Sequence, residues 1–281
     1  MSSIFILVQH LLPQHFLSRL VGRLAELKRP QWLKNKLITL FVKRYKVDMT
    51  EAFAPYPEAY ANFNEFFTRE LKPGARPLAD ADILSPADGA ISQFGNIEED
   101  QIFQAKGRHF SAKALLGSED WAEQFENGSF MTVYLSPKDY HRVHMPLDST
   151  LKATRYIPGD LFSVNKVTAE NVDNLFARNE RHVCLFETEF GPMAMVLVGA
   201  MIVAGIETTW EGQVAPPGNQ VITRQYQTPK DQITLQQGQE MGRFKLGSTV
   251  ILLFGQDAIA WETWCQADAE VRMGECIASR A

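Results

Sequence analysis

The sequence predicts an α+β protein in which an amphipathic helical N-terminal region, residues 1–74, precedes a mostly antiparallel β body, residues 75–281. Up to about residue 72, apolar residues recur at intervals of three and four, which is the spacing of helices. Beyond Pro73 and Gly74 they form short runs separated by turn residues, which is typical of strands. The length of 281 residues and the 45% hydrophobic content suit one large globular domain or two modest ones.

Two amphipathic helices are expected in the N-terminal region. Apolar residues follow helical spacing over residues 4–24, with an interruption at Pro13. Pro30 suits the start of a second helix that we expect to run to about Val47. In this second helix Trp32 and other apolar residues occupy one side, and the polar side is rich in lysine.

A third, short helix is expected after Asn62. Asn62 can accept a hydrogen bond from the backbone of the first turn, and Glu65 stands at the third helical position. The prolines and glycine of residues 73–77 then end the helical half of the chain.

The charge distribution points to an anionic partner for the N-terminal region. Residues 1–47 contain nine Lys and Arg but one acid, Glu26, although the whole chain has a net charge of −5. Basic amphipathic helices with a Trp favour an interfacial membrane anchor, on the cytoplasmic side of the cell membrane, over a helical cap with merely solvated charges. No nucleic-acid partner is expected, because no recognisable binding module accompanies the charge.

Cysteine and histidine usage predicts no metal site. The three cysteines, Cys184, Cys265 and Cys276, have no metal-like spacing and indicate a reducing compartment. His141 and His144 form a His-x-x-His pair, but no further ligand follows at motif spacing. No apolar run approaches the length of a transmembrane helix, and the N-terminus lacks the features of a signal peptide.

The body is expected to contain short strands and one helical segment. A buried strand should follow Ser248, and residues 211–242, rich in Gly, Pro and Gln, should form turns and an exposed hairpin. Gly191 and Pro192 should separate two strands, the second of them buried on both faces. One expected strand begins near residue 91, and the others span 130–135, 183–190, 193–203 and 250–254. The helical segment spans about 112–125.

The bond between Gly247 and Ser248 has two interpretations. It is either a glycine bend before a strand or a peptide bond that the protein itself attacks, because the serine hydroxyl lies within reach of the preceding carbonyl carbon. His144 is a candidate general base and Asp88 a candidate orienting acid, although Asp-Gly is also ordinary turn chemistry.

A serine, a histidine and an aspartate also allow a hydrolase of lipid esters, since triads are defined by geometry. Against this, Ser248 lacks the Gly-x-Ser-x-Gly elbow and leads into a strand. A non-enzymatic peripheral membrane scaffold is a further possibility.

The chain resembles the phosphatidylserine decarboxylase family, in its bacterial, pyruvoyl-dependent form. The resemblance covers nearly the whole sequence. It is carried by FKLGST at 244–249, SPADG at 85–89, YHRVH at 140–144, PGDLFSVN at 158–165 and NLFARNER at 174–181.

The resemblance implies self-cleavage by Asp88, His144 and Ser248. Ser248 attacks the carbonyl of Gly247, His144 takes the hydroxyl proton and Asp88 orients the imidazole. β-Elimination of the ester and hydrolysis of the dehydroalanine then leave a pyruvoyl group. The products are a chain of residues 1–247 and a chain of residues 248–281 that remain associated.

The resemblance also implies the reaction and its partners. A Schiff base between the pyruvoyl cofactor and phosphatidylserine accepts the electrons that decarboxylation leaves, giving phosphatidylethanolamine and CO2. His141, Phe162 and Ser163 are candidate substrate contacts. A homo-oligomer is expected, on an anionic membrane surface.

Overall fold

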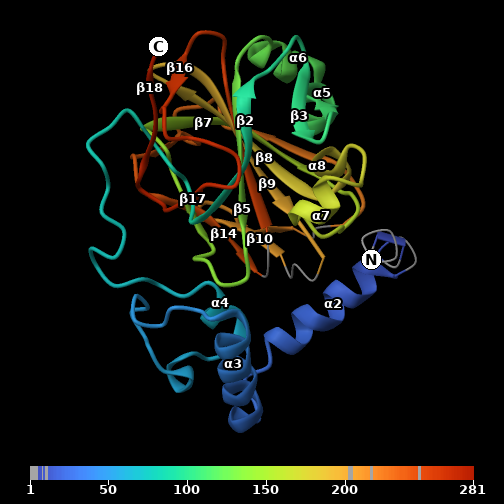
Figure 1. Cartoon of the computed structure of the whole chain (residues 1–281), viewed down its shortest axis with the longest axis vertical. Helices are drawn as coiled ribbons and strands as arrows, with labels where there is room; N and C mark the ends of the chain where they lie inside the picture. Colours follow the sequence, from blue (N-terminus) through green and yellow to red (C-terminus); the bar gives the residue numbers. More distant parts are fainter. Residues whose placement is uncertain (1–5, 8, 10–11, 202–204, 216–217, 246–247) are drawn as a thin grey trace.

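The computed structural model spans residues 1–281 and describes residues 6, 7, 9, 12–201, 205–215, 218–245 and 248–281. Figure 1 shows a helical N-terminal region below a body built of β-sheets, which confirms the α+β class. We call residues 12–74 the head and residues 75–281 the body.

From Gln14 onward the head contains the expected helices, while residues 4, 5, 8, 10 and 11 of the helical stretch expected before Pro13 lie outside the described residues. Helix α2 follows Pro13, which occupies its N-cap, and helix α3 follows Pro30 in the same way. The side-chain oxygen of Asn62 accepts a hydrogen bond of 2.8 Å from the backbone N–H of Glu65, so the predicted N-cap is confirmed. The helices of the head are α2 (Gln14–Ala25), α3 (Gln31–Tyr45), η1 (Pro57–Ala59) and α4 (Phe63–Phe67).

The prediction that the apolar residues of α3 share one side is wrong, because some of them are buried in the head and others are exposed to solvent. Ile38 is fully buried, and Phe41 packs edge-on against Phe66 of α4 with ring centroids 5.9 Å apart. Trp32 and Leu40 are instead 67% and 63% exposed. The short helix α4 covers only part of α3, so the remaining apolar residues stay on the surface.

The body is organised by a nine-stranded antiparallel sheet. Strand β15 lies inside it, paired with β9 on one side and β5 on the other, and every residue of β15 is buried. In order the strands are β12 (Ile222–Gln225), β7 (Ser149–Ile157), β8 (Arg181–Thr188), β9 (Gly191–Gly199), β15 (Ser248–Phe254), β5 (Ser129–Leu135), β2 (Gly89–Asn96) and β17 (Glu270–Val271), with β13 (Ile233–Leu235) also on β7.

Three smaller sheets and four short α-helices complete the body (Figure 1). The sheets are β11 (Gly212–Ala215), β10 (Gly205–Thr208), β14 (Glu240–Lys245) and β6 (Arg142–His144); β1 (Ile83–Leu84), β18 (Cys276–Arg280) and β16 (Ile259–Trp261); and β3 (Gln101–Ala105) with β4 (Arg108–Ser111). The helices are α5 (Ala112–Leu116), α6 (Glu119–Ala122) with the 3-10 turn η2 (Glu123–Phe125), α7 (Lys166–Ala169) and α8 (Leu175–Arg178).

The large sheet separates two hydrophobic cores. Successive side chains of a strand point to opposite faces, so Val250 and Leu252 enter one core while Ile251 and Leu253 enter the other. Each such residue stabilises the fold by about 1.5–3 kcal/mol on burial. The predicted strand after Ser248 is confirmed, and its uniform apolar character follows from burial on both faces.

The structure corrects several expected boundaries. Strand β8 ends at Thr188, and Gly191 and Pro192 belong to β9 instead of the turn. The segment 211–242 contains the strands β11, β12 and β13 and the beginning of β14. Of these strands only β12 is exposed throughout. Strand β7, with nine residues, has no clear periodic signal in the sequence. It is held by β8 on one side, with a register shift between Leu151 and Ala153, and by β12 and β13 on the other.

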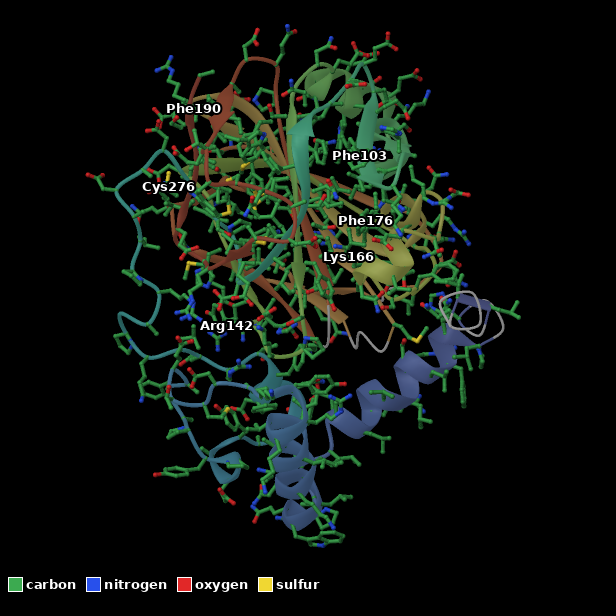
Figure 2. All side chains as sticks on the ribbon, viewed as in Figure 1. Phe103, Arg142, Lys166, Phe176, Phe190 and Cys276 are labelled. Carbon is green, nitrogen blue, oxygen red and sulfur yellow. The ribbon has the colours of Figure 1, made fainter. Side chains whose placement is uncertain are left out.

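Ion pairs join the head to the body. The guanidinium of Arg142 in β6 lies 3.3 Å from the carboxylate of Glu70 and 3.0 Å from that of Glu240. Figure 2 shows Arg142 at this junction. On the other side of the junction, Nζ of Lys245 in β14 lies 3.6 Å from Glu26 of α2. Within the described part of the chain, no helix has both the length and the apolar character needed to cross a bilayer.

Candidate active site

Three segments that carry candidate catalytic residues meet at one end of strand β5. Ala90 of β2 and Thr249 of β15 are both paired with Tyr134 of β5, from opposite sides. The two partners are therefore about 10 Å apart, twice the spacing of neighbouring strands. Asp88 precedes Ala90 by two residues and Ser248 precedes Thr249 by one, so the sheet brings both to this end.

His144 reaches the same region through the four-stranded sheet. Its backbone N–H donates a 2.8 Å hydrogen bond to the carbonyl of Pro86, close to Asp88 in the chain. Its strand β6 pairs with β14, the strand that leads toward Ser248. The backbone N–H of Phe244 in β14 likewise donates to the carbonyl of His141 at 3.0 Å.

Ser248 is fully buried at the first residue of β15. Its Cα partners are Leu135 of β5 and Gly199 of β9. Among the described residues its Oγ has no hydrogen-bond partner. Because an unpaired buried hydroxyl costs about 1–3 kcal/mol, such a group in a native protein calls for an explanation, and a reactive role supplies one. The predicted cleavage partner, Gly247, lies outside the described residues.

Asp88 is held by a buried ion pair. Nε of Arg76 donates to its two carboxylate oxygens at 2.8 and 3.0 Å, and the backbone N–H of Met273 donates to Oδ1 at 3.0 Å. Arg76 also bonds Glu51 of the head, at 2.7 Å. The next residue, Gly89, is required by close packing, since a Cβ there would lie 2.3 Å from the carbonyl oxygen of Tyr134.

The imidazole of His144 is neutral in this environment. Burial lowers its pKa. The carbonyl of Gly238 can only accept, so Nδ1 carries the proton and donates to it at 2.8 Å. Nε2 then accepts from the hydroxyl of Tyr140 at 3.0 Å. A neutral imidazole is the form that a general base requires.

His141 is a second neutral imidazole and is completely buried. Its Nδ1 donates to the carbonyl of Asp139 at 2.9 Å, and its ring packs on Phe67 of α4 with centroids 4.0 Å apart. Burial lowers the pKa of His141 to about 3. Its Nε2 has no hydrogen-bond partner among the described residues, so its lone pair is not engaged by them.

The hydrogen bonds of a triad are not formed in this arrangement. Among the described residues, the partners of Asp88 are Arg76 and Met273, and Nε2 of His144 bonds Tyr140. The charge of Asp88 still acts on His144, where it favours the protonated imidazole and opposes the effect of burial. The roles of Asp88, His144 and Ser248 therefore stay predictions.

The candidate substrate contacts Phe162 and Ser163 lie in the loop after β7. The side chain of Asn179 holds the backbone of Phe162 by bonds of 3.2 and 2.8 Å, and the guanidinium carbon of Arg178 lies 4.8 Å from the centre of its ring. The backbone N–H of Ser163 donates to Gln9 at 2.8 Å. Their role toward a substrate stays a prediction.

Sequence reasoning missed Arg76, Tyr140 and Glu180. Arg76 stands among turn residues, where no pattern marks a partner for Asp88. Tyr140 and Glu180 belong to the YHRVH and NLFARNER segments, and their hydrogen bonds to His144 and Tyr156 depend on the fold. No cluster of three or more His, Cys, Asp or Glu side chains within the described residues is arranged to hold a metal ion.

Known proteins resemble this chain over its whole length. A profile of the phosphatidylserine decarboxylase family matches residues 63–279, and a second profile, described as PSD, matches residues 4–46. A phosphatidylserine decarboxylase proenzyme of Saccharophagus degradans is 57% identical over 98% of this chain and 96% of its own length.

Two further relatives carry the same name. The protein from Pseudomonas putida is 57% identical over 100% of this chain and 99% of its own length. The protein from Shewanella baltica is 56% identical over 99% of this chain and 97% of its own length. The hydrolase and scaffold interpretations lose their support. The chain therefore belongs to the phosphatidylserine decarboxylase family and is an enzyme of this type.

Proposed function

We propose that the chain is a proenzyme that cuts itself between Gly247 and Ser248 and then decarboxylates phosphatidylserine. The observation that carries this proposal is the hydroxyl of Ser248, buried and without a partner among the described residues. Family membership supports the substrate, and the name proenzyme of the relatives supports processing.

The cut is an N-to-O acyl shift followed by elimination. Oγ of Ser248 bonds the carbonyl carbon of Gly247 as the C–N bond breaks, and the hydroxyl proton passes through His144 to the freed nitrogen. Loss of the Cα proton of Ser248 breaks its Cβ–Oγ bond and leaves a carboxylate on Gly247. Water then replaces the nitrogen of the dehydroalanine, so ammonia leaves and a ketone remains.

For His144 to act as the base, its Nε2 must exchange Tyr140 for Ser248. Burial raises the pKa of Tyr140, so the tyrosine stays protonated and remains a hydrogen-bond donor. Asp88, with Arg76 beside it, supplies a fixed negative charge that favours the imidazolium formed during the transfer.

The sheet pairing supports association of the two products. Strand β15 is paired on both sides with strands of residues 1–247, and β17 and β18 pair with β2 and β1. Residues 248–281 would thus remain part of the folded body after the cut, with the new N-terminal group fixed at the end of β5.

A pyruvoyl group at this position would capture the substrate amine and withdraw the electron pair left when CO2 departs. His141 would hold or move a proton beside this end of the sheet, and its lone pair, which no described residue engages, supports this role. The exposed apolar face of α2 would rest on the membrane that contains the substrate.

Intact mass of the purified protein tests the proposal. The wild type should give a C-terminal fragment of residues 248–281 without a free amine. Ser248→Ala and His144→Ala should remain uncut. Thr132→Val is the matched control, because Thr132 is also buried with an unpartnered hydroxyl in the same sheet, and it should be cut normally. Efficient cleavage of either alanine variant would remove that residue from the mechanism.

A further inference from the structure

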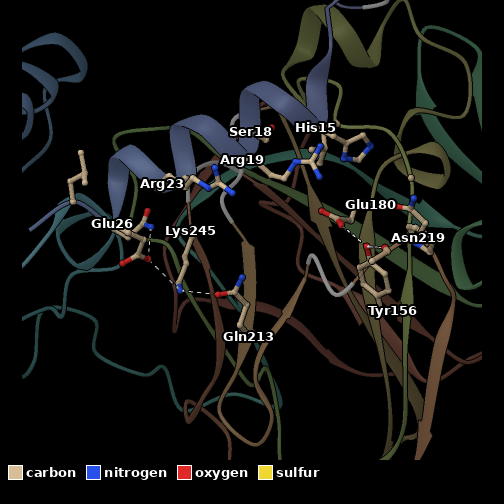
Figure 3. A pocket seen from close by; sticks show the side chains of 17 residues that line it. His15, Ser18, Arg19, Arg23, Glu26, Tyr156, Glu180, Gln213, Asn219 and Lys245 are labelled. Atoms are coloured by element: carbon tan, nitrogen blue, oxygen red, sulfur yellow. Dashed lines mark hydrogen bonds and ion pairs between the residues drawn. The ribbon is translucent and has the colours of Figure 1, made fainter.

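A cavity of about 1050 Å³ lies between helix α2 and the body. Figure 3 shows α2 along one wall of this cavity, with Tyr156 and Glu180 of the body on the opposite side. Pro158, Gly159 and Leu161 also line it, and Lys245 of β14 does so near Glu26. We call this space the α2 cavity.

Helix α2 presents two different faces. Phe16, Leu20 and Leu24 are 59%, 45% and 51% exposed and lie at helical spacing on the outer face. Arg19 and Arg23 lie on another face of the helix, where they line the α2 cavity and remain exposed (Figure 3). The arginines therefore border both the cavity and solvent, whereas the three apolar residues do not line the cavity.

The two arginines are available for an anion. No hydrogen bond or ion pair joins the guanidinium of Arg19 or Arg23 to another described residue. The neighbouring charges are already engaged. Glu26 accepts from the side chains of Asn62 and Asn64 at 2.8 Å, and Lys245 lies 2.5 Å from Glu207. Guanidinium groups suit phosphate and carboxylate oxygens.

The opposite wall of the cavity carries a buried carboxyl group. Glu180 is 4% exposed, and its Oε1 accepts a hydrogen bond of 2.5 Å from the hydroxyl of Tyr156. Burial raises the pKa of Glu180, while the bond from Tyr156 and the charge of His15 oppose that shift. A carboxylate with a raised pKa is a better acceptor for a proton.

Glu180 stands beside the strand partner of Ser248. Gly199 is paired with Ser248, and directly paired residues of an antiparallel sheet point to the same face. A Cβ on Gly199 would lie 3.6 Å from Leu161 and 3.9 Å from Oε2 of Glu180. Both of these residues line the α2 cavity, so the cavity adjoins the face of the sheet to which Ser248 belongs.

We propose that the α2 cavity receives the headgroup of the phospholipid, with Arg19 and Arg23 binding its phosphate and Glu180 binding its amine. This inference rests on the proposed function, because it takes the substrate from there. The headgroup carries a phosphate, a carboxylate and an ammonium. Of the charged groups that line the cavity, Glu26 and Lys245 are engaged by other side chains, which leaves the two arginines and the buried carboxyl group of Glu180 for the headgroup. Transfer of the ammonium proton to Glu180 would leave the uncharged amine that attack on a ketone needs.

The test measures headgroup binding to the full, purified protein. Borohydride treatment converts any pyruvoyl ketone to an alcohol, so that no covalent bond to an amine can form. The probes are dihexanoyl phosphatidylethanolamine, which has phosphate and amine, and dihexanoyl phosphatidylglycerol, which has phosphate alone. Dissolved short-chain lipids make the measurement independent of a membrane.

The wild type should bind the amine-bearing probe more tightly by about tenfold, as one charge-assisted contact allows. Glu180→Gln should remove that preference. Its matched control is Glu211→Gln, because Glu211 also accepts a hydrogen bond from a tyrosine, Tyr226, but lies outside the α2 cavity. The control should keep the preference.

The double variant Arg19→Gln with Arg23→Gln should weaken both probes by about tenfold or more. Lys28→Gln with Arg29→Gln removes the same charge from exposed positions outside the cavity and should leave binding near the wild-type value. Equal losses in the two double variants would overturn the arginine contact. A preference retained by Glu180→Gln would overturn the amine contact.

Intact mass of the same samples separates this inference from the proposed function. An uncut wild type would reject the self-cleavage proposal, while the two probes would still report on the cavity. A correctly cut Glu180→Gln variant that keeps the amine preference would reject the present inference alone.

Discussion

The head and the body use similar apolar patterns for different purposes. In β15 the apolar residues are buried on both faces of a sheet, each against other strands. In α2 and α3 residues with the same hydrophobicity are more than 40% exposed, including Leu20, Leu24, Trp32 and Leu40. The difference teaches that the body buries its apolar residues in large cores, whereas the head has a small core and leaves apolar side chains on its surface that a membrane could cover.

The junction between the two regions shows a further contrast. It is held by charged groups, with Arg76 bridging Glu51 of the head and Asp88 of the body. The side chain of Arg76 is 7% exposed, so this pair is buried. Stability and the placement of a candidate catalytic acid therefore depend on the same contact.

The largest effect is expected when Arg76 is replaced. Arg76→Met should lower the free energy of unfolding by about 3–5 kcal/mol, because Asp88 would remain buried without its partner. Urea denaturation measures the change. In the matched control, Lys138→Met breaks the exposed Lys138–Glu270 pair and should cost less than about 1 kcal/mol. Equal losses of unfolding free energy in the two variants would show that the buried pair at the junction contributes no more than an exposed pair.

A comparison of two leucines tests the contrast between body and head directly. Leu252→Ala should lower the free energy of unfolding by about 2–5 kcal/mol, since it opens a cavity in the core of the large sheet. Leu20→Ala should change it by about 0.5 kcal/mol or less. If both variants lost the same stability, the head would be part of the cooperative core.

Acid should destabilise the body through its buried histidines. Burial lowers the pKa of His182 to about 3, and neither ring nitrogen has a partner among the described residues. The unfolded chain binds this proton near pH 6.5, so stability is present above that pH and falls as the pH drops toward 3. Between about pH 7 and pH 5, His182 should account for a loss of up to about 2 kcal/mol.

His182→Leu should therefore show a smaller loss of unfolding free energy over that range than the wild type. His109→Leu serves as the control, because His109 is exposed, and it should retain the wild-type dependence. An unchanged slope in His182→Leu would mean that His182 is not held neutral by the fold.

The smallest effect on stability, but a clear one on binding, is expected for the outer face of α2. Leu20→Ser with Leu24→Ser should weaken binding to anionic vesicles by about tenfold or more, since exposed apolar area enters the lipid. The melting temperature should stay close to the wild-type value. Val167→Ser with Val221→Ser changes exposed apolar residues of the body and is the matched control. Equal binding losses would contradict a membrane role specific to the head.

Local patterns in the sequence predict elements wherever local physics decides. Pro13 and Pro30 limit the helices because proline cannot continue a preceding helix, and Asn62 caps α4 through a bond within one turn. Strand β15 is predictable because a short apolar run suits burial on both faces. Strand β7 is not, since its apolar and polar residues do not alternate throughout and its register shifts between Leu151 and Ala153.

The sequence by itself determined the α+β class, the helical head, the short strands and, through its motifs, the family, and it predicts the roles of Asp88, His144 and Ser248. Only the tertiary structure decided what these residues touch. It paired Asp88 with Arg76 and His144 with Tyr140, and it brought Arg19 and Arg23 to the wall of the α2 cavity. Motifs reflect local chemistry along the chain. The hydrogen-bond partners of these residues depend instead on how segments distant in the sequence pack together, which no local pattern specifies.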